Sequence, residues 1–569
     1  MFKFSKILFS SILCSFMSVA YVNAQDLSGI KNQKPISFNG SLEARGFFYN
    51  ANGIPNRREA SSYLISGSPN LTIYGWDIPF YISYGNQGTQ FSQPFNQYGL
   101  SPTYKWITLH GGYRNVSFGQ FTLAGHTMLG GGVEIKPGKL RAGFMYGRLN
   151  KATVIDTTTN SLVPYAFNRK GVAAKLGFGS DKNYFDLSFL SAKDDSTSKP
   201  IFNRAFENNV AAAKNVALGF NTRFSFLKNF FFESEGALSV YTRDMNSTLS
   251  LDSVKNDAFQ QLQKILNVNG TTEFYTALTA GIGYRNANYG LKVNYRRIEP
   301  DYKTMGAYFF ANDVENWTIS PSFNSKNRKY RFNGSVGLQR DNIMKQKEST
   351  TKRVIGSLNA GADFTKSFSL DLAYSNFSNN QRPSTVKFDQ MLKIVQTTHT
   401  VSIMPRYTIF GQQSNQVIML SSNFSRMNDF NDYFDQQAVS RDIKTDQYFL
   451  NYVVSFTKIP VSLNGNLSYT TLSSDLMKNN YKGVGFGGSY TFAKTKAQVN
   501  MANNIIQGSA QGIKSLTLNS SVNFNYKVDK RQTLKASVFF TNNDPGSAIT
   551  NVNPSFTETR GELAYQISF

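Results

Sequence analysis

The sequence has almost no cysteine and very little histidine. Its 569 residues include one cysteine and three histidines. Cys14 lies in an N-terminal segment that we expect to be removed, so the mature chain has no disulfide, thiol nucleophile or cysteine-bound metal. His110, His126 and His399 show no local spacing that indicates a catalytic set with serine or aspartate. We therefore expect neither an enzyme nor a cofactor or metal site.

Long hydrophobic runs are also scarce. The run from Ile7 to Val19 follows Lys3 and Lys6, spans only about a dozen residues, and is too short for a membrane anchor. The small residues that end at Ala24 complete the pattern of a signal peptide, which we predict to span 1–24. No later stretch of about 20 apolar residues occurs, so we expect no transmembrane helix. Residues 25–35 would form a short periplasmic segment before a single domain, 36–569.

Period-two alternation fills that domain. From Ile36 to Phe48, apolar residues occupy one parity and polar residues such as Glu43 and Arg45 occupy the other. The same alternation recurs in 216–226, 368–375 and 516–526, with no charge on the apolar parity. Many runs are longer than the strands of a soluble sandwich, and a strand of about 9 to 11 residues already crosses a bilayer. The pattern therefore predicts an all-β fold: a single closed antiparallel transmembrane β-barrel.

Connections that alternate in length give the strand number. Short polar turns such as Ser180–Asn183 and Ala493–Lys496 alternate with longer connections such as 194–213 and 244–270. This is the arrangement of short periplasmic turns and long external loops. A direct count gives about 25 strands, and splitting 103–119 at His110-Gly111-Gly112 restores the alternation. We predict about 26 strands, with about 24 as the nearest alternative.

The charge balance is strongly basic. The net charge is +24, or +22 without the two lysines of the signal peptide. The cations are spread over strands and turns without a clustered patch, so we expect no nucleic-acid partner. A lumen lined by cations favours anionic solutes, whereas a partly ion-paired wall would be neutral, and the sequence leaves both open. By parity, the charges expected in the lumen are Glu43, Arg45, Lys175, Arg223, Glu233, Glu235, Lys292, Arg296, Arg331, Lys527 and Lys535.

One segment has helical rather than strand periodicity. Phe259, Leu262, Ile265 and Leu266 recur at helical intervals after Asp252-Ser253. We predict a short amphipathic helix in this external connection. Its apolar stripe would fold inward and narrow the lumen, or it would pack against a partner protein.

The chain ends on a strand that finishes in an aromatic residue. The apolar parity of this strand comprises Gly561, Leu563, Tyr565, Ile567 and Phe569. This ending resembles the signal by which bacterial outer-membrane β-barrel proteins are read by the barrel assembly machinery. The segments MYGRL and GAYFFANDVENWTISP are also similar to those of large outer-membrane barrels of the Bacteroidota. The resemblance implies a multi-pass barrel in the bacterial outer membrane, with outer-membrane lipid and the assembly machinery as partners.

Two functions remain open. The first is a channel or facilitated transporter for small polar solutes, with anions as a candidate class. The second is a non-catalytic structural or assembly component of an outer-membrane secretion or biogenesis complex, in which the barrel has a protein partner. The first strand begins about ten residues after the signal peptide, which disfavours the plug domain of an energised receptor.

Removal of the terminal aromatic residue should impair assembly. We predict that deleting Phe569, or replacing it in Phe569→Asp, severely reduces the amount of barrel in the outer membrane. Aspartate would remove the aromatic end of the last strand and place a charge at the membrane interface. Heat-modifiable barrel in outer-membrane fractions reports the outcome, and unchanged levels would refute this role.

Overall fold

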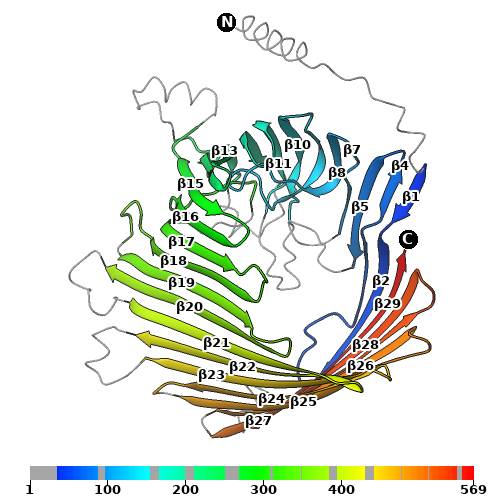
Figure 1. Cartoon of the computed structure of the whole chain (residues 1–569). Helices are drawn as coiled ribbons and strands as arrows, with labels where there is room; N and C mark the ends of the chain where they lie inside the picture. The colour runs from blue at the N-terminus through cyan, green and yellow to red at the C-terminus, as the bar shows by residue number, and fades with distance from the viewer. Residues whose placement is uncertain are drawn as a thin grey trace, which may run out of the picture.

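The computed structural model describes residues 35–569, except for 87–95, 154–165, 199–210, 250–267, 308–311, 348, 384–393, 430–440, 476, 511 and 547–553. All named regular elements within this part of the chain are strands (Figure 1). The predicted helix near 252–270 lies almost entirely outside the described residues.

The first elements are β1 (Ile36–Asn39), β2 (Ser41–Asn52), β3 (Ser61–Gly67), β4 (Asn70–Ile73), β5 (Trp76–Gly85), β6 (Gln97–Leu100), β7 (Thr103–Tyr104), β8 (Ile107–Asn115), β9 (Thr127–Ile135), β10 (Leu140–Asn150), β11 (Arg169–Gly179), β12 (Tyr184–Asp194), β13 (Lys214–Phe226), β14 (Phe230–Thr242) and β15 (Thr272–Arg285). The remaining elements are β16 (Tyr289–Ile298), β17 (Val314–Asn324), β18 (Tyr330–Arg340), β19 (Ser349–Asp363), β20 (Phe368–Pro383), β21 (Ile394–Phe410), β22 (Ser414–Asp429), β23 (Ile443–Phe456), β24 (Val461–Ser473), β25 (Lys478–Phe492), β26 (Ala497–Ala510), β27 (Ile513–Lys527), β28 (Gln532–Asp544) and β29 (Phe556–Ser568).

Three pairs of these elements are single strands with an interruption. Gly40 separates β1 from β2 with φ at +105°, and a Cβ there would lie 2.4 Å from the carbonyl oxygen of Ser68. Pro69 and Pro102 lie in the breaks between β3 and β4 and between β6 and β7, where a missing amide proton interrupts the ladder. Joining these pairs reduces the 29 elements of the described chain to 26 strands. The predicted number of about 26 is confirmed.

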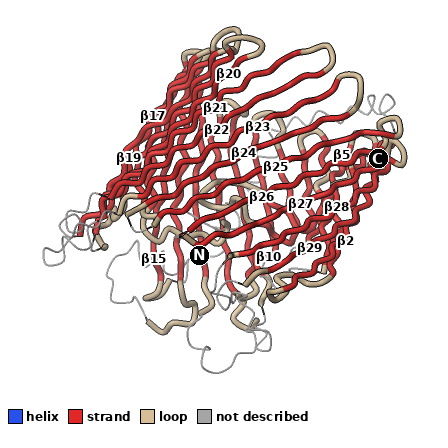
Figure 2. The backbone as a smooth tube through the Cα atoms, turned by 90° about the horizontal axis from the view of Figure 1, so that it is seen from below, coloured by secondary structure: helices blue, strands red, loops and turns tan. Residues whose placement is uncertain are grey.

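The sheet closes on itself. Consecutive strands pair antiparallel, and β29 pairs with both β28 and β2, from Ser41↔Ser568 to Asn52↔Thr557. Figure 1 shows the resulting ring, and Figure 2 shows the slanted strands from another side. At the seam, the Phe569 amide donates to the Gly40 carbonyl at 2.9 Å, and the Phe38 and Phe569 rings lie 4.3 Å apart. Closure supplies every edge with a hydrogen-bonding neighbour.

The predicted turn at His110-Gly111-Gly112 is wrong. β8 runs straight through these residues, and the turn lies instead at Lys105–Trp106, between the paired Tyr104 and Ile107. Gly112 has φ at +85°, and a Cβ there would lie 2.4 Å from the Tyr98 carbonyl oxygen. The glycines therefore accommodate the close antiparallel pairing of β6 with β8 rather than a chain reversal.

Large apolar side chains cover the outside of the ring. Leu176, Phe178, Leu187, Leu218 and Leu338 are each at least 53% exposed. So extensive an apolar surface is untenable in water but is the lipid-facing surface of a membrane barrel. The protein is therefore a β-barrel of the bacterial outer membrane. Within the described residues, no helix is long and apolar enough to cross a membrane, a finding that does not bear on crossing by strands.

The two ends of the barrel differ. Short turns, such as 180–183 and 493–496, occupy the end at which β1 begins and β29 finishes. Longer connections, such as 116–126 and 299–313, lie mostly at the other end. By the usual arrangement of these barrels, the short turns are periplasmic and the long loops external.

Single cysteines test this orientation on a background without other mature cysteines. Lys345 lies exposed between β18 and β19 at the long-loop end, and Lys182 lies exposed in a short turn. In intact cells, a membrane-impermeant maleimide should label Lys345→Cys and not Lys182→Cys, which should react only after the outer membrane is permeabilised. The reverse labelling pattern would invert the topology.

Candidate functional site: two loops folded into the lumen

Small residues recur at the middle of the inner face of the five strands from β11 to β15. The buried alanines of this face are each at most 9% exposed: Ala173, Ala192, Ala217, Ala237 and Ala277. Exposed outward residues such as Leu218 and Leu238 occupy the opposite parity on the same strands. We call this inner face the alanine wall. Because these side chains are small, other parts of the chain can pack close to the sheet.

The loop between β8 and β9 packs on the alanine wall. We call residues 116–126, with the sequence VSFGQFTLAGH, inner loop A. Its four large apolar side chains are at most 6% exposed: Val116, Phe118, Phe121 and Leu123. Their burial takes them out of the aqueous lumen, and each full burial contributes roughly 1.5–3 kcal/mol. The loop is therefore a packed element of the barrel interior.

Polar contacts fix the depth of inner loop A. Thr122 Oγ1 donates to Ser188 Oγ at 2.9 Å, and the Gln120 amide donates to the Glu235 carboxylate. Ser188 and Glu235 lie near the middle of β12 and β14. A Cβ added at Gly219 would lie 2.8 Å from Thr122 Cγ2, so this wall position must be glycine or the loop must move. Inner loop A thus reaches about half the depth of the barrel wall.

A second loop holds the first in place. We call residues 299–307, which follow β16, inner loop B. Tyr302 Oη donates to the Phe121 carbonyl at 2.5 Å, and Thr304 Oγ1 donates to the Thr122 carbonyl at 3.0 Å. Tyr302 is 2% exposed, and its burial raises the pKa of the phenol, which keeps it a neutral donor. The two loops therefore form one unit.

Inner loop B is also tied to the wall. Asn215 of β13 is fully buried; its amide nitrogen donates to Ser239 Oγ at 2.8 Å, and its oxygen accepts from the Met305 amide at 3.0 Å. Ser239 Oγ in turn donates to the Lys303 carbonyl at 2.6 Å. These bonds satisfy the buried amide and the loop backbone together. Loss of the Asn215 side chain would leave the Met305 amide without this hydrogen bond.

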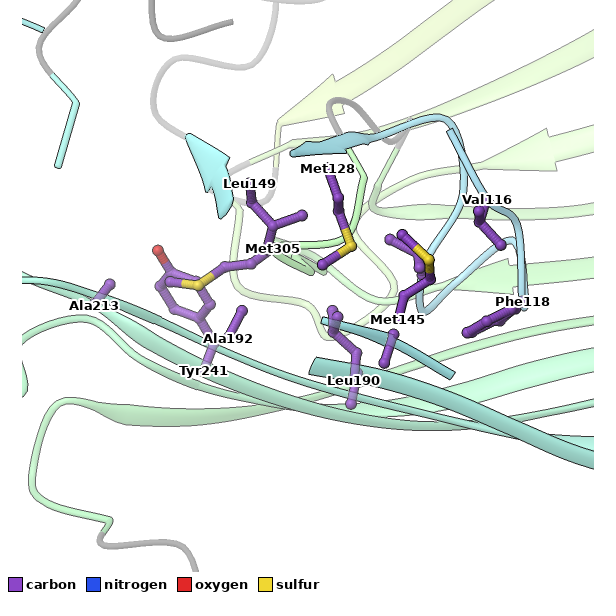
Figure 3. Close-up of a cluster of buried hydrophobic side chains, with 13 residues drawn as sticks. Val116, Phe118, Met128, Met145, Leu149, Leu190, Ala192, Ala213, Tyr241 and Met305 are labelled. Atoms are coloured by element: carbon purple, nitrogen blue, oxygen red, sulfur yellow. The ribbon is translucent and has the colours of Figure 1, made fainter. Parts of the chain in front are cut away.

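Methionines fill the space between the loops and the wall. Met128, Met145 and Met305 are at most 2% exposed and lie in one cluster with Leu149 and Leu190 (Figure 3). The sticks in Figure 3 come from both loop and wall and point toward one another. Flexible thioethers suit such an irregular interface. The cluster anchors the loop pair along one side of the ring.

A cavity of about 790 Å³ lies beside inner loop B, toward the loop ends of the strands. Two ion pairs line it: Arg169 Nε lies 2.7 Å from Asp194 Oδ1, and Arg243 Nε lies 2.8 Å from Glu273 Oε2. Lys303 Nζ lies 4.7 Å from the centroid of the Tyr241 ring. Because each of these arginines has a carboxylate partner, the lining is polar but locally neutral.

His126, the last residue of inner loop A, also lines this cavity. It is 3% exposed, and burial lowers the pKa of its imidazole to about 4, with a smaller contribution from the charge of Arg169. Its Nδ1 lies 3.1 Å from the Thr127 carbonyl oxygen, which fits a neutral ring that donates from Nδ1. At neutral pH the loop is therefore anchored by an uncharged histidine.

Cross-strand contacts bring several of the predicted lumen charges together. Glu43 pairs with Arg45 and with Lys535, whose Nζ lies 2.6 Å from its carboxylate. Glu233 lies 2.6 Å from Lys292 and 3.9 Å from Arg223. These residues form two clusters on opposite sides of the ring, and both clusters contain acids as well as bases.

The other predicted charges have different surroundings. Arg331 pairs with Asp363 at 2.8 Å, and Lys175 pairs with Glu134 at 3.3 Å. Glu235 contacts inner loop A, as described above, and Lys527 is exposed at the end of β27. Arg296 Nε is buried and, among the described residues, has no hydrogen-bond partner. Their role in the lumen stays a prediction.

Sequence reasoning missed one constellation. Ser101 Oγ lies 2.8 Å from His110 Nδ1, and His110 Nε2 lies 3.3 Å from Glu134. Serine, histidine and a carboxylate are the groups of a hydrolase relay. However, Ser101 is 5% exposed and Glu134 is shared with Lys175, so the set resembles a buried polar network. No sequence signal could identify it, because the strand register alone aligns β8 with β9.

Inner loops A and B were also missed, as were the acidic partners Glu134 and Asp363. Alternation identifies the face of a cation, but the cross-strand register decides which carboxylate it meets. One sequence feature could have indicated that inner loop A is buried: four large apolar residues lie in a connection that would otherwise be exposed to water. Among the described residues, no group of three or more histidine, cysteine, aspartate or glutamate side chains is arranged to hold a metal ion.

Comparisons with known proteins give only distant structural similarities. No protein-family model matches the chain, and no curated protein matches it. Among solved structures, the copper transporter OprC has a TM-score of 0.38 and 9% identity over 94% of this chain and 84% of that chain. The P pilus usher PapC translocation pore has a TM-score of 0.37 and 11% identity over 94% of this chain and 100% of that chain. With such low scores, these similarities assign neither a function nor a substrate.

Acid should loosen inner loop A through His126. The folded pKa lies below the ordinary 6.5, so the stabilisation is complete above pH 6.5 and is lost as the pH falls toward about 4. The loss at pH 5 is about 2 kcal/mol. Hydrogen–deuterium exchange of 116–126, corrected for intrinsic rates, should therefore accelerate between pH 7 and pH 5.

His126→Asn is the matched control, because asparagine keeps a donor for the Thr127 carbonyl but does not titrate. Its corrected exchange should be independent of pH over this range. Wild-type exchange that does not change with pH would contradict a neutral, buried His126.

Proposed function

We propose that the protein is a passive outer-membrane channel or facilitated transporter for small polar solutes, in which inner loops A and B form the constriction. The observation that carries this proposal is the loop pair packed at about half depth against the alanine wall, with a polar cavity of about 790 Å³ beside it. A barrel of this strand number is wide, so solute selection needs elements that narrow it. The loop pair supplies such an element.

We propose anions as the favoured solutes. The support comes from three inner-face arginines, Arg114, Arg296 and Arg560, each with a buried Nε that lacks a hydrogen-bond partner within the described residues. All three lie in the loop-side half of their strands, β8, β16 and β29. Unneutralised cations in a pore lower the energy of a passing anion. The ion-paired clusters at Glu43 and Glu233 contribute little to this preference, because their charges largely cancel.

The rival function is a non-catalytic structural or assembly component of an outer-membrane complex. Such a role requires a stable protein partner and does not require conduction. The buried position of Ser101 supports a non-enzymatic function in either case. Membrane lipid and the barrel assembly machinery as partners, and the resemblance to barrels of the Bacteroidota, are parts of the same proposal.

Conductance of the purified barrel in planar bilayers tests the channel function. Under a salt gradient, the reversal potential of the wild type should show anion selectivity. Arg114→Gln/Arg296→Gln/Arg560→Gln should reduce that selectivity severalfold, because one unpaired charge at close range is worth about 1 kcal/mol or more in a pore of intermediate dielectric.

A triple control removes the same charge outside the lumen: Lys326→Gln/Lys345→Gln/Lys366→Gln. It should retain the wild-type selectivity. Tyr302→Phe, which removes the bond to inner loop A, should increase the mean conductance. Absence of conductance in the wild type and in Tyr302→Phe, together with a co-purifying protein, would support the structural role instead.

A further inference from the structure

A groove lies on the outer face of the barrel, at the short-turn end of β11, β12 and β13. Its volume is about 600 Å³. The register places its apolar lining on the same face as Leu218, which faces the membrane. We call this cavity the outer groove. Five large apolar side chains line it, each at least 44% exposed: Leu176, Phe178, Phe185, Leu187 and Phe224.

The apolar lining of the outer groove has two layers. Phe178 pairs with Phe185 beside the turn, and Leu176 pairs with Leu187 one layer further from it. Lipid surrounds this face of the barrel, and a cavity left empty would deprive its lining of dispersion contacts. An acyl chain is apolar and flexible enough to fill such an irregular space. The groove therefore suits the chain of a neighbouring lipid.

The turn end of the outer groove, which we call its mouth, is polar. Lys139 of the turn 136–139 lines it, as do Ser180 and Asn183 of the turn 180–183. Lys139 Nζ lies 5.9 Å from the centroid of the Phe178 ring, so the ammonium lies at the boundary between the apolar lining and the turn. Lys182 lies exposed between Ser180 and Asn183. The whole cavity is thus amphipathic, with an apolar interior and lysines at the mouth.

The mouth is positively charged even when its acid is counted. The two turns contain three lysines, Lys136, Lys139 and Lys182, and one acid, Asp181, so their net charge is +2. Asp181 Oδ1 lies 3.2 Å from Nη1 of Arg141, a residue of the inner face. The charge at the mouth therefore complements an anionic headgroup.

The other short turns of this end are basic as well. Nine short turns contain a lysine, and together they contain two acids, Asp181 and Asp529. A basic surface beside a membrane attracts anionic headgroups. The lysines of these turns are Lys105, Lys139, Lys182, Lys228, Lys326, Lys366, Lys458, Lys494 and Lys530.

Exposed aromatic residues indicate the depth of the groove in the membrane. In the next hairpin, Phe226 and Phe230 flank the turn of Lys228, and their ring centroids lie 5.8 Å apart. Aromatic residues form girdles at both membrane interfaces of outer-membrane barrels. Phe178 precedes its own turn in the same way and is 64% exposed. The mouth therefore lies at the headgroups of the periplasmic leaflet, and Leu176 lies deeper, among the acyl chains.

We propose that the outer groove binds an anionic phospholipid of the periplasmic leaflet. One acyl chain lies along Leu176 and Leu187, and the phosphate lies at the mouth beside Lys139 and Lys182. A hydrogen bond from an ammonium to a phosphate oxygen is stronger than one between neutral groups. A zwitterionic headgroup offsets part of this attraction, because it carries a cation of its own. The site does not depend on whether the lumen conducts.

Lipid titration monitored by native mass spectrometry tests this site on the full barrel. The probes are phosphatidylglycerol and phosphatidylethanolamine with the same acyl chains. The wild type should bind phosphatidylglycerol more tightly. Lys139→Gln/Lys182→Gln should weaken that binding about tenfold, to the level of phosphatidylethanolamine, because each lysine beside an anionic headgroup contributes. Lys139→Arg/Lys182→Arg should retain the preference.

A second variant tests the apolar part of the site. Leu176→Trp fills the outer groove from the lipid side, so it should weaken the binding of both lipids severalfold. Leu218→Trp is its matched control, since Leu218 is equally lipid-facing but does not line the groove. It should bind both lipids as the wild type does. Heat-modifiability confirms that each variant is folded.

Lys326→Gln/Lys366→Gln is the matched control for charge, because it removes two lysines from short turns elsewhere on the ring. It should bind phosphatidylglycerol as the wild type does. An equal loss in this control, equal binding of the two lipids by the wild type, or unchanged binding by Leu176→Trp would each overturn the proposal. A dimer that dissociates in Leu176→Trp would show that a second copy of the chain occupies the groove instead.

Discussion

The structure depends on one constraint: a backbone in lipid must satisfy all its hydrogen bonds internally. An open sheet of this length would leave two edges unpaired in hydrocarbon. Pairing of β29 with β2 removes both edges, and Phe569 at the seam donates to Gly40. Closure then divides every strand into an outer face, which meets acyl chains, and an inner face, which is free to be polar. The inner loops and the outward-facing apolar residues both follow from this division.

The residues of the inner face differ from one side of the ring to the other. Along β11 to β15 the wall carries buried alanines, and two loops pack on it through a methionine-rich cluster and the buried Asn215. Elsewhere, clusters such as Glu43 with Arg45 and Lys535 place charged side chains on the wall, and the opposite charges largely cancel. In the proposed channel, the β11 to β15 side of the lumen holds the loop pair that forms the constriction. In that channel, selectivity depends on arginines such as Arg296, whose Nε has no hydrogen-bond partner among the described residues.

On the outer face, apolar and polar residues occupy different heights along the strands. Aromatic and aliphatic residues cover the hydrocarbon region, and lysines such as Lys139 and Lys182 follow where the strands leave it. His399 fits the same arrangement: its Nδ1 lies 3.0 Å from the Tyr374 hydroxyl oxygen on the outward parity, where a polar cluster suits the membrane interface. The inner loops and the outward-facing apolar residues lie on opposite faces of the same strands.

The sequence by itself determined the barrel and the strand number, because alternation with a period of two is a local property that follows from one face meeting lipid and the other meeting water. The sequence misplaced the turn near β8, because glycines at 111 and 112 suit a close strand pairing as well as a chain reversal. Only the tertiary structure decided that 116–126 folds inward and which acid each cation meets. Those outcomes depend on the register between strands far apart in sequence, and on the burial that register creates.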